Sequence, residues 1–289
     1  MDLRKVVRGV GKTLIALGVL IFLFVAYELW GTGIAEARDQ KALKKQFEKQ
    51  LQAAPPTIPG SEAPEAPPVT VADPGDAIGL IEIPKIGVTK AIVEGVGTED
   101  LKKAPGHYPG TPLPGQAGNA AIAGHRTTYG APFSSLDELN PGDPINVTTT
   151  EGKFRYEVDH TDIVSPSEVS VLEPTEDNRL TLTTCNPKFS AAQRLIVVAR
   201  LAGPTKDPPP APAPAVPAPT LNTAGLSGVS SSNGPALLWG LLAGLIWLAA
   251  WAVGQSWKKW PAYAIATPFF LVVLFVFFEN VSRLLPANV

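Results

Sequence analysis

Cysteine is nearly absent from this chain, and its charges almost balance. The 289 residues include one cysteine, Cys185, which excludes an internal disulfide and a zinc site built from several cysteines. The formal net charge of -2 excludes the strongly basic surface with which many proteins bind nucleic acid. The sequence also lacks an acidic cluster with the spacing of a calcium-binding loop. We therefore predict no nucleic-acid partner, no metal and no cofactor.

The first apolar run predicts a membrane-spanning helix near the N-terminus. Residues 1–12 carry several basic side chains, and residues 13–30 are almost entirely apolar. This run is long enough to cross a bilayer, and its basic flank favours a cytoplasmic N-terminus. A cleaved secretory signal is the alternative, because Ala35-Glu36-Ala37 resembles a cleavage site. The run is longer than the usual apolar core of a signal, which favours an uncleaved anchor.

Two further apolar runs, residues 235–253 and 261–278, predict two more transmembrane helices. The loop between them, residues 254–260, contains lysines, and short basic loops stay in the cytoplasm. Both charge signals therefore place the long segment after the first span outside the cell. The predicted protein is a multi-pass plasma-membrane protein. Its tail, residues 279–289, is also predicted outside, although Arg283 weakly opposes that placement.

Composition divides the segment between the spans into spacers and one globular domain. Residues 31–75 predict a stalk, with a short solvated helix over the charged stretch 36–52 and an extended linker over the Pro- and Ala-rich stretch 53–75. Residues 203–234 predict a second linker, rich in Pro and then in Gly and Ser. Residues 76–202 have the composition and size of an ordinary globular domain.

Short runs rich in β-branched residues recur along the globular domain and predict strands. The runs cover residues 78–83, 86–93, 119–123, 145–150, 154–164, 179–184 and 195–201. Residues 145–150 and 154–164 pair naturally as a hairpin across Glu151-Gly152. Many short strands with few helices indicate an all-β barrel or sandwich.

The only cysteine lies at the end of a predicted strand. Residues 179–184 alternate polar with apolar side chains, which predicts a half-buried strand, and Asn186-Pro187 ends it just past Cys185. A thiol in this position can be reached from outside. Arg194 opens the next strand, and the loop between can bring its cation beside the sulfur, which favours the nucleophilic thiolate. Alternatively, a single cysteine is a small buried hydrophobe without chemistry.

The chain has three histidines, and one of them occupies a position like that of the cysteine. His125 directly follows Gly124 at the end of a predicted buried strand. His107 lies in a Pro- and Gly-rich loop and is a weaker candidate for lining a site, whereas His160 lies inside a strand pattern and is predicted to be structural or exposed. A histidine, a cysteine and an arginine at strand ends are a candidate general acid–base, nucleophile and oxyanion stabiliser. Spacing alone leaves open whether they converge.

Several motifs resemble those of the sortases. The run Thr181-Leu182-Thr183-Thr184-Cys185, followed by Arg194, resembles the TLxTC…R signature of that family, and Gly124-His125-Arg126 resembles its histidine motif. A longer run, residues 124–133, resembles the class E sortases of actinobacteria, and so does Leu136-Asp137-Glu138-Leu139 followed by Pro141-Gly142-Asp143. The resemblance covers residues 76–202. The two C-terminal spans are not part of the general sortase pattern.

This resemblance implies an eight-stranded β-barrel and a cysteine transpeptidase. Cys185 would attack the Thr–Gly bond of a Leu-Ala-x-Thr-Gly-like sorting signal, His125 would transfer protons to and from the amines, and Arg194 would stabilise the oxyanion. Tyr129 matches a tyrosine that would lie near the second signal position, or else packs within its loop. Thr184 would line the substrate groove or else fill a strand position.

The implied partners are secreted proteins that bear a C-terminal sorting signal and an amine on a cell-wall precursor, joined at the membrane. The sequence leaves three alternatives open. A pilin-polymerising sortase would use a lysine of another protein as the amine. A non-catalytic, membrane-bound scaffold with the same barrel would need none of the three site residues. A hydrolase would transfer the acyl group to water.

Overall fold

The computed structural model describes residues 3–53, 72–202, 233–256 and 259–282, which belong to two compact units. One unit contains the described residues up to Gly31 and those from 233 onward, and the other contains the described residues from Thr32 to 202. The predicted linkers over 53–75 and 203–234 lie largely outside the described residues. So do part of the predicted loop 254–260, most of the tail 279–289, and Arg283.

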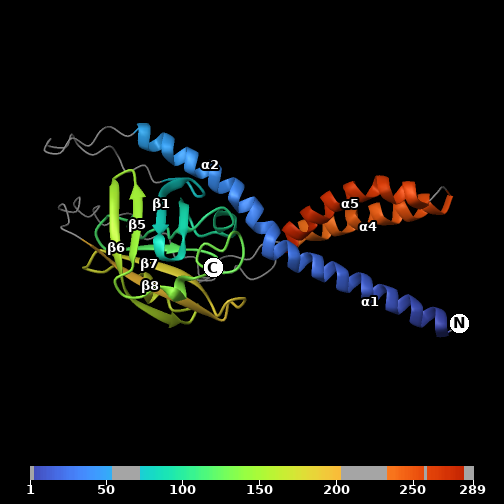
Figure 1. Cartoon of the computed structure of the whole chain (residues 1–289), viewed down its shortest axis with the longest axis horizontal. Helices are drawn as coiled ribbons and strands as arrows, with labels where there is room; N and C mark the ends of the chain where they lie inside the picture. Colours follow the sequence, from blue (N-terminus) through green and yellow to red (C-terminus); the bar gives the residue numbers. More distant parts are fainter. Residues whose placement is uncertain (1–2, 54–71, 203–232, 257–258, 283–289) are drawn as a thin grey trace. The chain divides into compact units, whose positions relative to one another are not determined.

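Eight strands of the larger unit close into a barrel in the order β1-β2-β3-β4-β7-β8-β6-β5. Figure 1 shows the strands of this unit as arrows, with β1, β5, β6, β7 and β8 labelled. The strands are β1 (Ala77–Ile83), β2 (Val88–Glu94), β3 (Gly106–His107), β4 (Asn119–Ala123), β5 (Pro144–Thr149), β6 (Gly152–Val164), β7 (Arg179–Asn186) and β8 (Gln193–Leu201). Closure pairs every strand on both sides, so the sheet has no free edge. The all-β, eight-stranded barrel predicted from the sequence is confirmed.

Short helical turns connect the strands. They are η2 (Pro84–Ile86), α3 (Thr98–Leu101), η3 (Leu136–Glu138) and η4 (Val169–Leu172). The run predicted as a strand from residue 86 begins instead at Val88, because Pro84 starts a 3-10 turn that ends in the left-handed conformation at Gly87, with φ 66°. The predicted hairpin is confirmed, and its strands meet at Thr149 and Gly152.

The barrel interior is filled by aliphatic and aromatic side chains. Its fully buried members include Ile81, Ile83, Ile92, Ile122, Phe133, Ile145, Val147, Leu180, Leu182 and Val197. A second cluster with Leu101, Tyr108, Ala121, Ala123 and Leu172 covers the other face of β4. The central strands are therefore buried on both faces.

This double burial corrects the prediction of a half-buried strand over residues 179–184. Thr181 and Thr183 on the supposed outer face are almost fully buried. The threonine hydroxyls are tolerated there because each has a hydrogen-bond partner. Thr181 donates to Asn119 Oδ1 at 2.7 Å, and the Thr183 hydroxyl bonds the Tyr108 hydroxyl at 3.2 Å.

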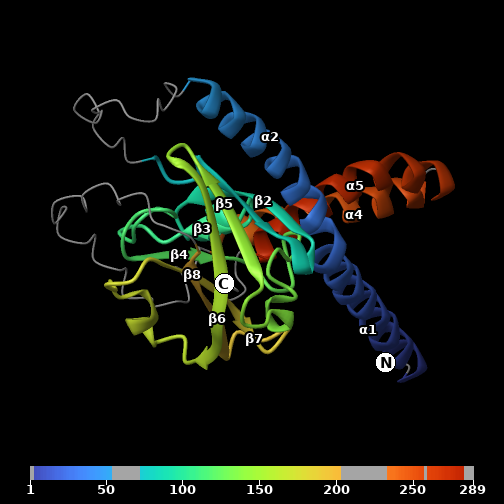
Figure 2. The same ribbon diagram turned by 60° about the vertical axis from the view of Figure 1, so that its left-hand side comes forward.

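Helix α2 (Thr32–Ala53) packs against β1 and β2 of the barrel (Figures 1 and 2). The sequence predicts a solvated helix here, but one face of α2 is buried, formed by Thr32, Glu36, Gln40, Leu43 and Phe47. These residues recur every three or four positions, which places them on one side of a helix. Leu43 and Phe47 join a cluster with Ala77, Ala91 and Val93, so α2 is an integral part of the larger unit.

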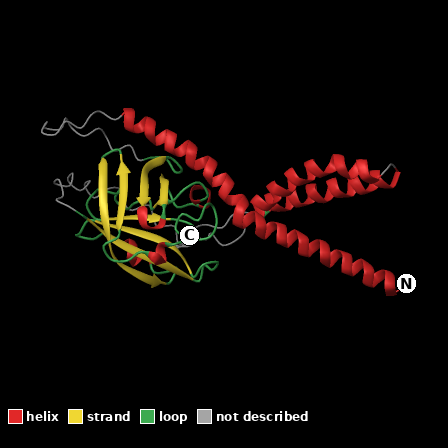
Figure 3. Cartoon of the chain, viewed as in Figure 1, coloured by secondary structure: helices red, strands yellow, loops and turns green. Residues whose placement is uncertain are grey.

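The smaller unit contains the apolar helices α1 (Leu3–Ala26), α4 (Gly234–Ser256) and α5 (Lys259–Ser282), with a π-helical turn η1 (Tyr27–Gly31) after α1 (Figure 3). Among the described residues, three helices are long and apolar enough to cross a membrane. Helices α4 and α5 pack together, and the ring of Tyr27 contacts that of Phe275 edge-on, with centroids 5.1 Å apart. Phe24 contacts Phe278 in the same way at 5.4 Å.

Candidate active site

Strand register brings the three predicted site residues to one end of the barrel. Strand β4 runs parallel to β7, with Ala123 opposite Thr183, and β7 runs antiparallel to β8, with Cys185 directly opposite Arg194. Directly opposed residues of neighbouring strands project from the same face of a sheet. His125 follows Ala123 by the same two positions by which Cys185 follows Thr183. The sheet therefore aligns the ends of three adjacent strands that carry a histidine, a cysteine and an arginine.

The loop after β4, residues 124–131, is tied closely to β7. Gly124 N–H donates to the carbonyl of Thr183 at 3.1 Å, and the Thr184 hydroxyl donates to the carbonyl of Gly124 at 2.7 Å. A Cβ at position 124 would lie 2.6 Å from the ring of Phe133, so only glycine fits there. Thr184 is fully buried, and in this structure its hydroxyl holds the loop that carries His125.

Cys185 is more enclosed than its position at a strand end predicts, since its side chain is only 4% exposed. Burial raises the pKa of the Cys185 thiol, because the thiolate loses its hydration. The nearby guanidinium groups of Arg194 and Arg126 act in the opposite direction and favour the thiolate. The reactivity of this thiol is thus set by two opposing effects, of which burial is the larger.

Arg194 is buried, with 1% of its surface exposed. Its Nη1 donates to the carbonyl oxygens of Ala191 and Gln193, each at 2.9 Å. These bonds hold the guanidinium within the turn that joins β7 to β8. An arginine stays charged at every relevant pH and offers several donors in one plane. The site therefore has a fixed cation directly across from the sulfur-bearing residue.

Arg126 is a site residue that the sequence did not single out beyond its place in a motif. Its Nη1 donates to the Cys185 carbonyl at 2.9 Å and to Asn186 Oδ1 at 2.8 Å, and its Nη2 pairs with Asp137 at 3.1 Å. Arg126 thereby joins the His125 loop to the end of β7. One of its partners is the backbone carbonyl of Cys185, a contact that no sequence pattern reveals.

Tyr129 lies against His125, with ring centroids 5.0 Å apart. It is largely buried, and the Lys102 ammonium lies 5.9 Å from the centre of its ring. The Thr128 hydroxyl lies 3.4 Å from His125 Nδ1. Tyr129 thus borders the candidate site through its contact with the histidine ring, and it also packs within its own loop.

Tyr108 is a second residue near the site that the sequence did not single out. Its side chain is buried beneath β4 and β7, and burial raises the pKa of Tyr108 to about 12. The Tyr108 hydroxyl is therefore neutral. It hydrogen-bonds the hydroxyl of Thr183, which precedes Cys185 by two positions on β7. The positive charge of Arg194 lowers the pKa of Tyr108, but by less than burial raises it.

The other two histidines lie outside this constellation. His107 is buried in β3, where Nδ1 bonds Glu94 at 2.8 Å and Nε2 contacts the Thr111 hydroxyl at 2.9 Å. Both ring nitrogens are engaged in structural bonds, so His107 is not available to a site. His160 is exposed on β6 beside Asp159 and Asp162. Among the described residues, no group of three or more His, Cys, Asp or Glu side chains could hold a metal ion.

Alkylation of Cys185 should report the electrostatics of the site. In the full chain, the rate with iodoacetamide is expected to rise with pH and to reach half its maximum above the ordinary pKa of a thiol, because burial disfavours the thiolate. Arg126→Met should move this midpoint to still higher pH, because it removes a cation that favours the thiolate. Arg155→Met, at an exposed position on β6, is the matched control. A midpoint below that of a free thiol would contradict this description.

Comparison with known proteins places the chain in a family. A family model described as the sortase domain matches residues 81–202. Sortase SrtE1 of Streptomyces coelicolor is 35% identical over 207 residues, covering 66% of this chain and 55% of that protein. The sortase-like protein YwpE of Bacillus subtilis is 31% identical over 85 residues, covering 29% of this chain and 83% of that protein. The chain belongs to the sortase family, and the resemblance predicted from its motifs is confirmed.

The solved structures that match include a sortase D5 transpeptidase of Clostridium perfringens. The two chains are 32% identical with a TM-score of 0.47, and the match covers 58% of this chain and 98% of the other. The chain spans little more than half the length of the Streptomyces SrtE1 that it matches.

Proposed function

We propose that this protein is a cysteine transpeptidase with His125, Cys185 and Arg194 as its catalytic residues. The observation that carries the proposal is the register of β4, β7 and β8, which aligns these three residues at one end of the barrel. Membership of the sortase family supports the same reaction. A scaffold without chemistry would not need a buried arginine directly across from a cysteine.

The reaction follows from the chemistry of the three side chains. The Cys185 thiolate attacks the threonine carbonyl of a sorting signal, and the Arg194 guanidinium stabilises the oxyanion that forms. The Thr–Gly bond breaks as His125 donates a proton to the leaving glycine amine, which leaves a thioester on the sulfur. An incoming amine then attacks the thioester and loses a proton to His125. The new amide is released, and the cysteine returns as thiolate.

Substrate and location follow from the family and the apolar helices. We propose that the signal is of the Leu-Ala-x-Thr-Gly type, as the resemblance of the motifs to class E sortases implies, and that the acceptor is an amine of a cell-wall precursor. The N-terminus would lie in the cytoplasm and residues 76–202 outside the plasma membrane, tethered by three spans. Tethering raises the effective concentration of enzyme and substrate when both are held at one membrane. Tyr129 would line the site near the second signal position.

A ligation assay tests this function. The full chain in detergent is mixed with a Leu-Ala-x-Thr-Gly peptide or its Leu-Pro-x-Thr-Gly counterpart, each with triglycine as the amine, and the products are identified by mass spectrometry. The expected result is a ligated product that forms faster from the alanine peptide. Cleavage without ligation under excess amine would indicate a hydrolase. Equal rates with the two peptides would contradict the proposed signal.

A further inference from the structure

We propose that Thr32 and Glu36 of helix α2 are positioning residues for the loop that carries His125. This inference deepens the proposed function, since it takes His125 as the residue that transfers protons. It assigns a role in catalysis to the helix that follows the first apolar span in the sequence. That helix lies outside residues 81–202, the part of the chain that matches the sortase domain.

The first contact joins Thr32 to the backbone of Tyr129. Both residues are buried, and the Tyr129 N–H donates to the Thr32 hydroxyl oxygen at 3.1 Å. A buried backbone donor needs such an acceptor, because leaving it unpaired is costly. Thr32 therefore fixes the position of the Tyr129 amide from outside the barrel.

The loop conformation makes this restraint necessary. Tyr129 and Ala131 have positive φ angles of 49° and 42°, a region that residues with a Cβ seldom adopt. Such conformations persist only when the surrounding structure over-determines them. The Thr32 bond supplies one restraint, and a bond from Ala131 N–H to the Thr128 carbonyl at 2.8 Å supplies another.

The second contact joins Glu36 to Gly130. A Cβ built at Gly130 would overlap the Glu36 carboxylate, so this side chain lies directly on the loop backbone. Glu36 is almost fully buried and pairs with Lys90 Nζ of β2 at 2.6 Å. The ion pair satisfies a charge that burial would otherwise penalise and holds the carboxylate in place. Glu36 thereby connects α2, β2 and the loop.

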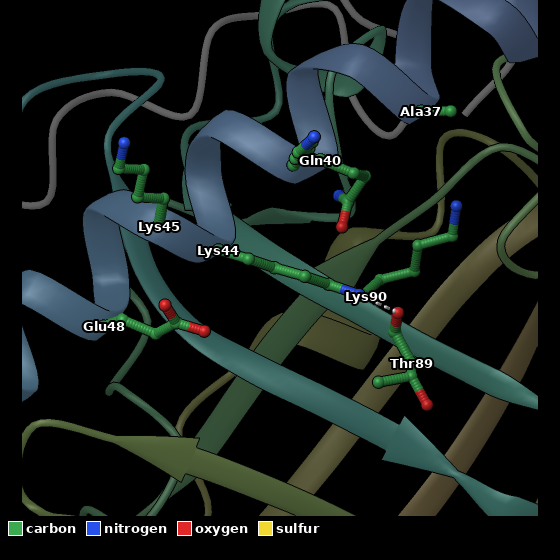
Figure 4. A pocket seen from close by; sticks show the side chains of 8 residues that line it. Ala37, Gln40, Lys44, Lys45, Glu48, Thr89 and Lys90 are labelled. Atoms are coloured by element: carbon green, nitrogen blue, oxygen red, sulfur yellow. Dashed lines mark hydrogen bonds between the residues drawn. The ribbon is translucent and has the colours of Figure 1, made fainter.

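Helix α2 is itself held firmly enough to serve as a support. Gln40 donates to the carbonyls of Ala91 and Lys103, each at 3.2 Å, and accepts from Ala91 N–H at 2.7 Å. Lys44 Nζ reaches from α2 to the Thr89 carbonyl at 2.8 Å (Figure 4). A pocket of about 620 Å³ that is open to solvent lies beside this contact and is lined by Ala37, Gln40, Lys41, Lys44, Lys45, Glu48, Thr89 and Lys90.

These contacts reach the histidine through one intermediate residue. Thr32 holds the Tyr129 backbone, and the Tyr129 ring lies against the His125 ring with centroids 5.0 Å apart. Release of Tyr129 would let the imidazole leave its position without disturbing Cys185, which is held by the pairing of β7 with β8. The expected defect is thus in proton transfer rather than in the nucleophile.

Kinetics of the full chain in detergent test the inference with closely matched variants. Thr32→Val keeps the side-chain shape and removes the acceptor, whereas Thr32→Ser keeps the acceptor. We expect Thr32→Val to lower kcat about ten- to a hundredfold, with little change in KM and an unchanged rate of Cys185 alkylation, because a displaced catalytic group slows the chemical step. Thr32→Ser should retain most of the activity. Wild-type kcat in Thr32→Val, or equal loss in both variants, would overturn the inference.

Glu36→Gln should lower kcat in the same way, since it breaks the ion pair with Lys90 beneath Gly130. Glu48→Gln is the control, because Glu48 lies on the same helix with its side chain exposed. We expect the control to have wild-type kinetics. If Glu48→Gln lowered kcat as much as Glu36→Gln does, the effect would come from the net charge of α2, which would contradict a positioning role for Glu36.

Hydrogen exchange decides the inference independently of activity. Amides of residues 124–131 should exchange faster in Thr32→Val than in the wild type or in Thr32→Ser, while those of β7 and β8 exchange as in the wild type. If the wild type alkylates at Cys185 but forms no ligated product, the proposed function fails while this comparison still decides the loop contact. Unchanged exchange over residues 124–131 in Thr32→Val would overturn the inference even if the enzyme is active.

Discussion

The Cys185→Ala variant of the full chain is expected to lose ligation of sorting-signal peptides by roughly 10⁴-fold or more, because no other group in the reaction can form the thioester. The fold should survive, since alanine fills most of the volume of this buried thiol and strand pairing at position 185 uses only the backbone. We expect the free energy of unfolding to change by no more than about 1–2 kcal/mol. Ligation rates and thermal unfolding followed by circular dichroism provide the two measurements.

The Cys185→Ser variant is the control for shape, because it keeps a side chain of similar size with a far weaker nucleophile at neutral pH. It should be nearly as inactive as Cys185→Ala and fold as well as the wild type. Ligation by Cys185→Ala at more than a small fraction of the wild-type rate would show that the sulfur is not the nucleophile.

The Arg194→Lys variant should lower kcat by roughly 10²–10³-fold, which is the usual cost of removing an oxyanion donor. Lysine keeps the positive charge but has one nitrogen in place of the planar guanidinium, so it cannot both bond Ala191 and Gln193, as Arg194 Nη1 does, and offer a second nitrogen to the oxyanion. Because the charge is retained, the pH midpoint of Cys185 alkylation should stay near that of the wild type. A lower kcat with an unchanged midpoint would show that the variant impairs oxyanion binding and not thiolate formation.

The matched control for Arg194→Lys is Arg200→Lys, on the same strand but at an exposed position beside Asp159. We expect wild-type kinetics from this control. If Arg194→Lys were as active as Arg200→Lys, the guanidinium would have no special part in the reaction.

Local signals in the sequence predicted a barrel or a sandwich and marked three candidate catalytic residues, and the resemblance of the motifs then implied the eight-stranded barrel. Runs of β-branched residues predicted every strand except the short β3, where a Pro- and Gly-rich loop was expected around His107, and Cys185, Arg194 and His125 each lie near the end of a strand. The alignment of these three residues depends on strand register. In that register Ala123 of β4 pairs with Thr183 of β7, although the two strands are far apart in the sequence. Spacing along the chain could not supply it.

Other parts of the site depend on contacts that leave no mark in the sequence. Arg126 acts through the carbonyl of Cys185, and any residue type offers a carbonyl. The buried face of α2 was hidden by its polar members, Thr32, Glu36 and Gln40, which look like a solvated surface until the barrel provides their partners. From composition it is easier to predict that a helix forms than to predict what the helix packs against.

Intact-protein mass spectrometry of the acyl-enzyme tests the central claim most directly. The full chain is mixed with a Leu-Ala-x-Thr-Gly peptide, without added amine, and quenched in acid within the first turnovers. We predict a species heavier by the peptide portion ending in threonine, less one water, with fragmentation placing the added mass on Cys185. Addition of triglycine before the quench should remove this species and yield the ligated peptide. Peptide cleavage with no adduct, at the same rate in Cys185→Ala, would contradict a thioester mechanism.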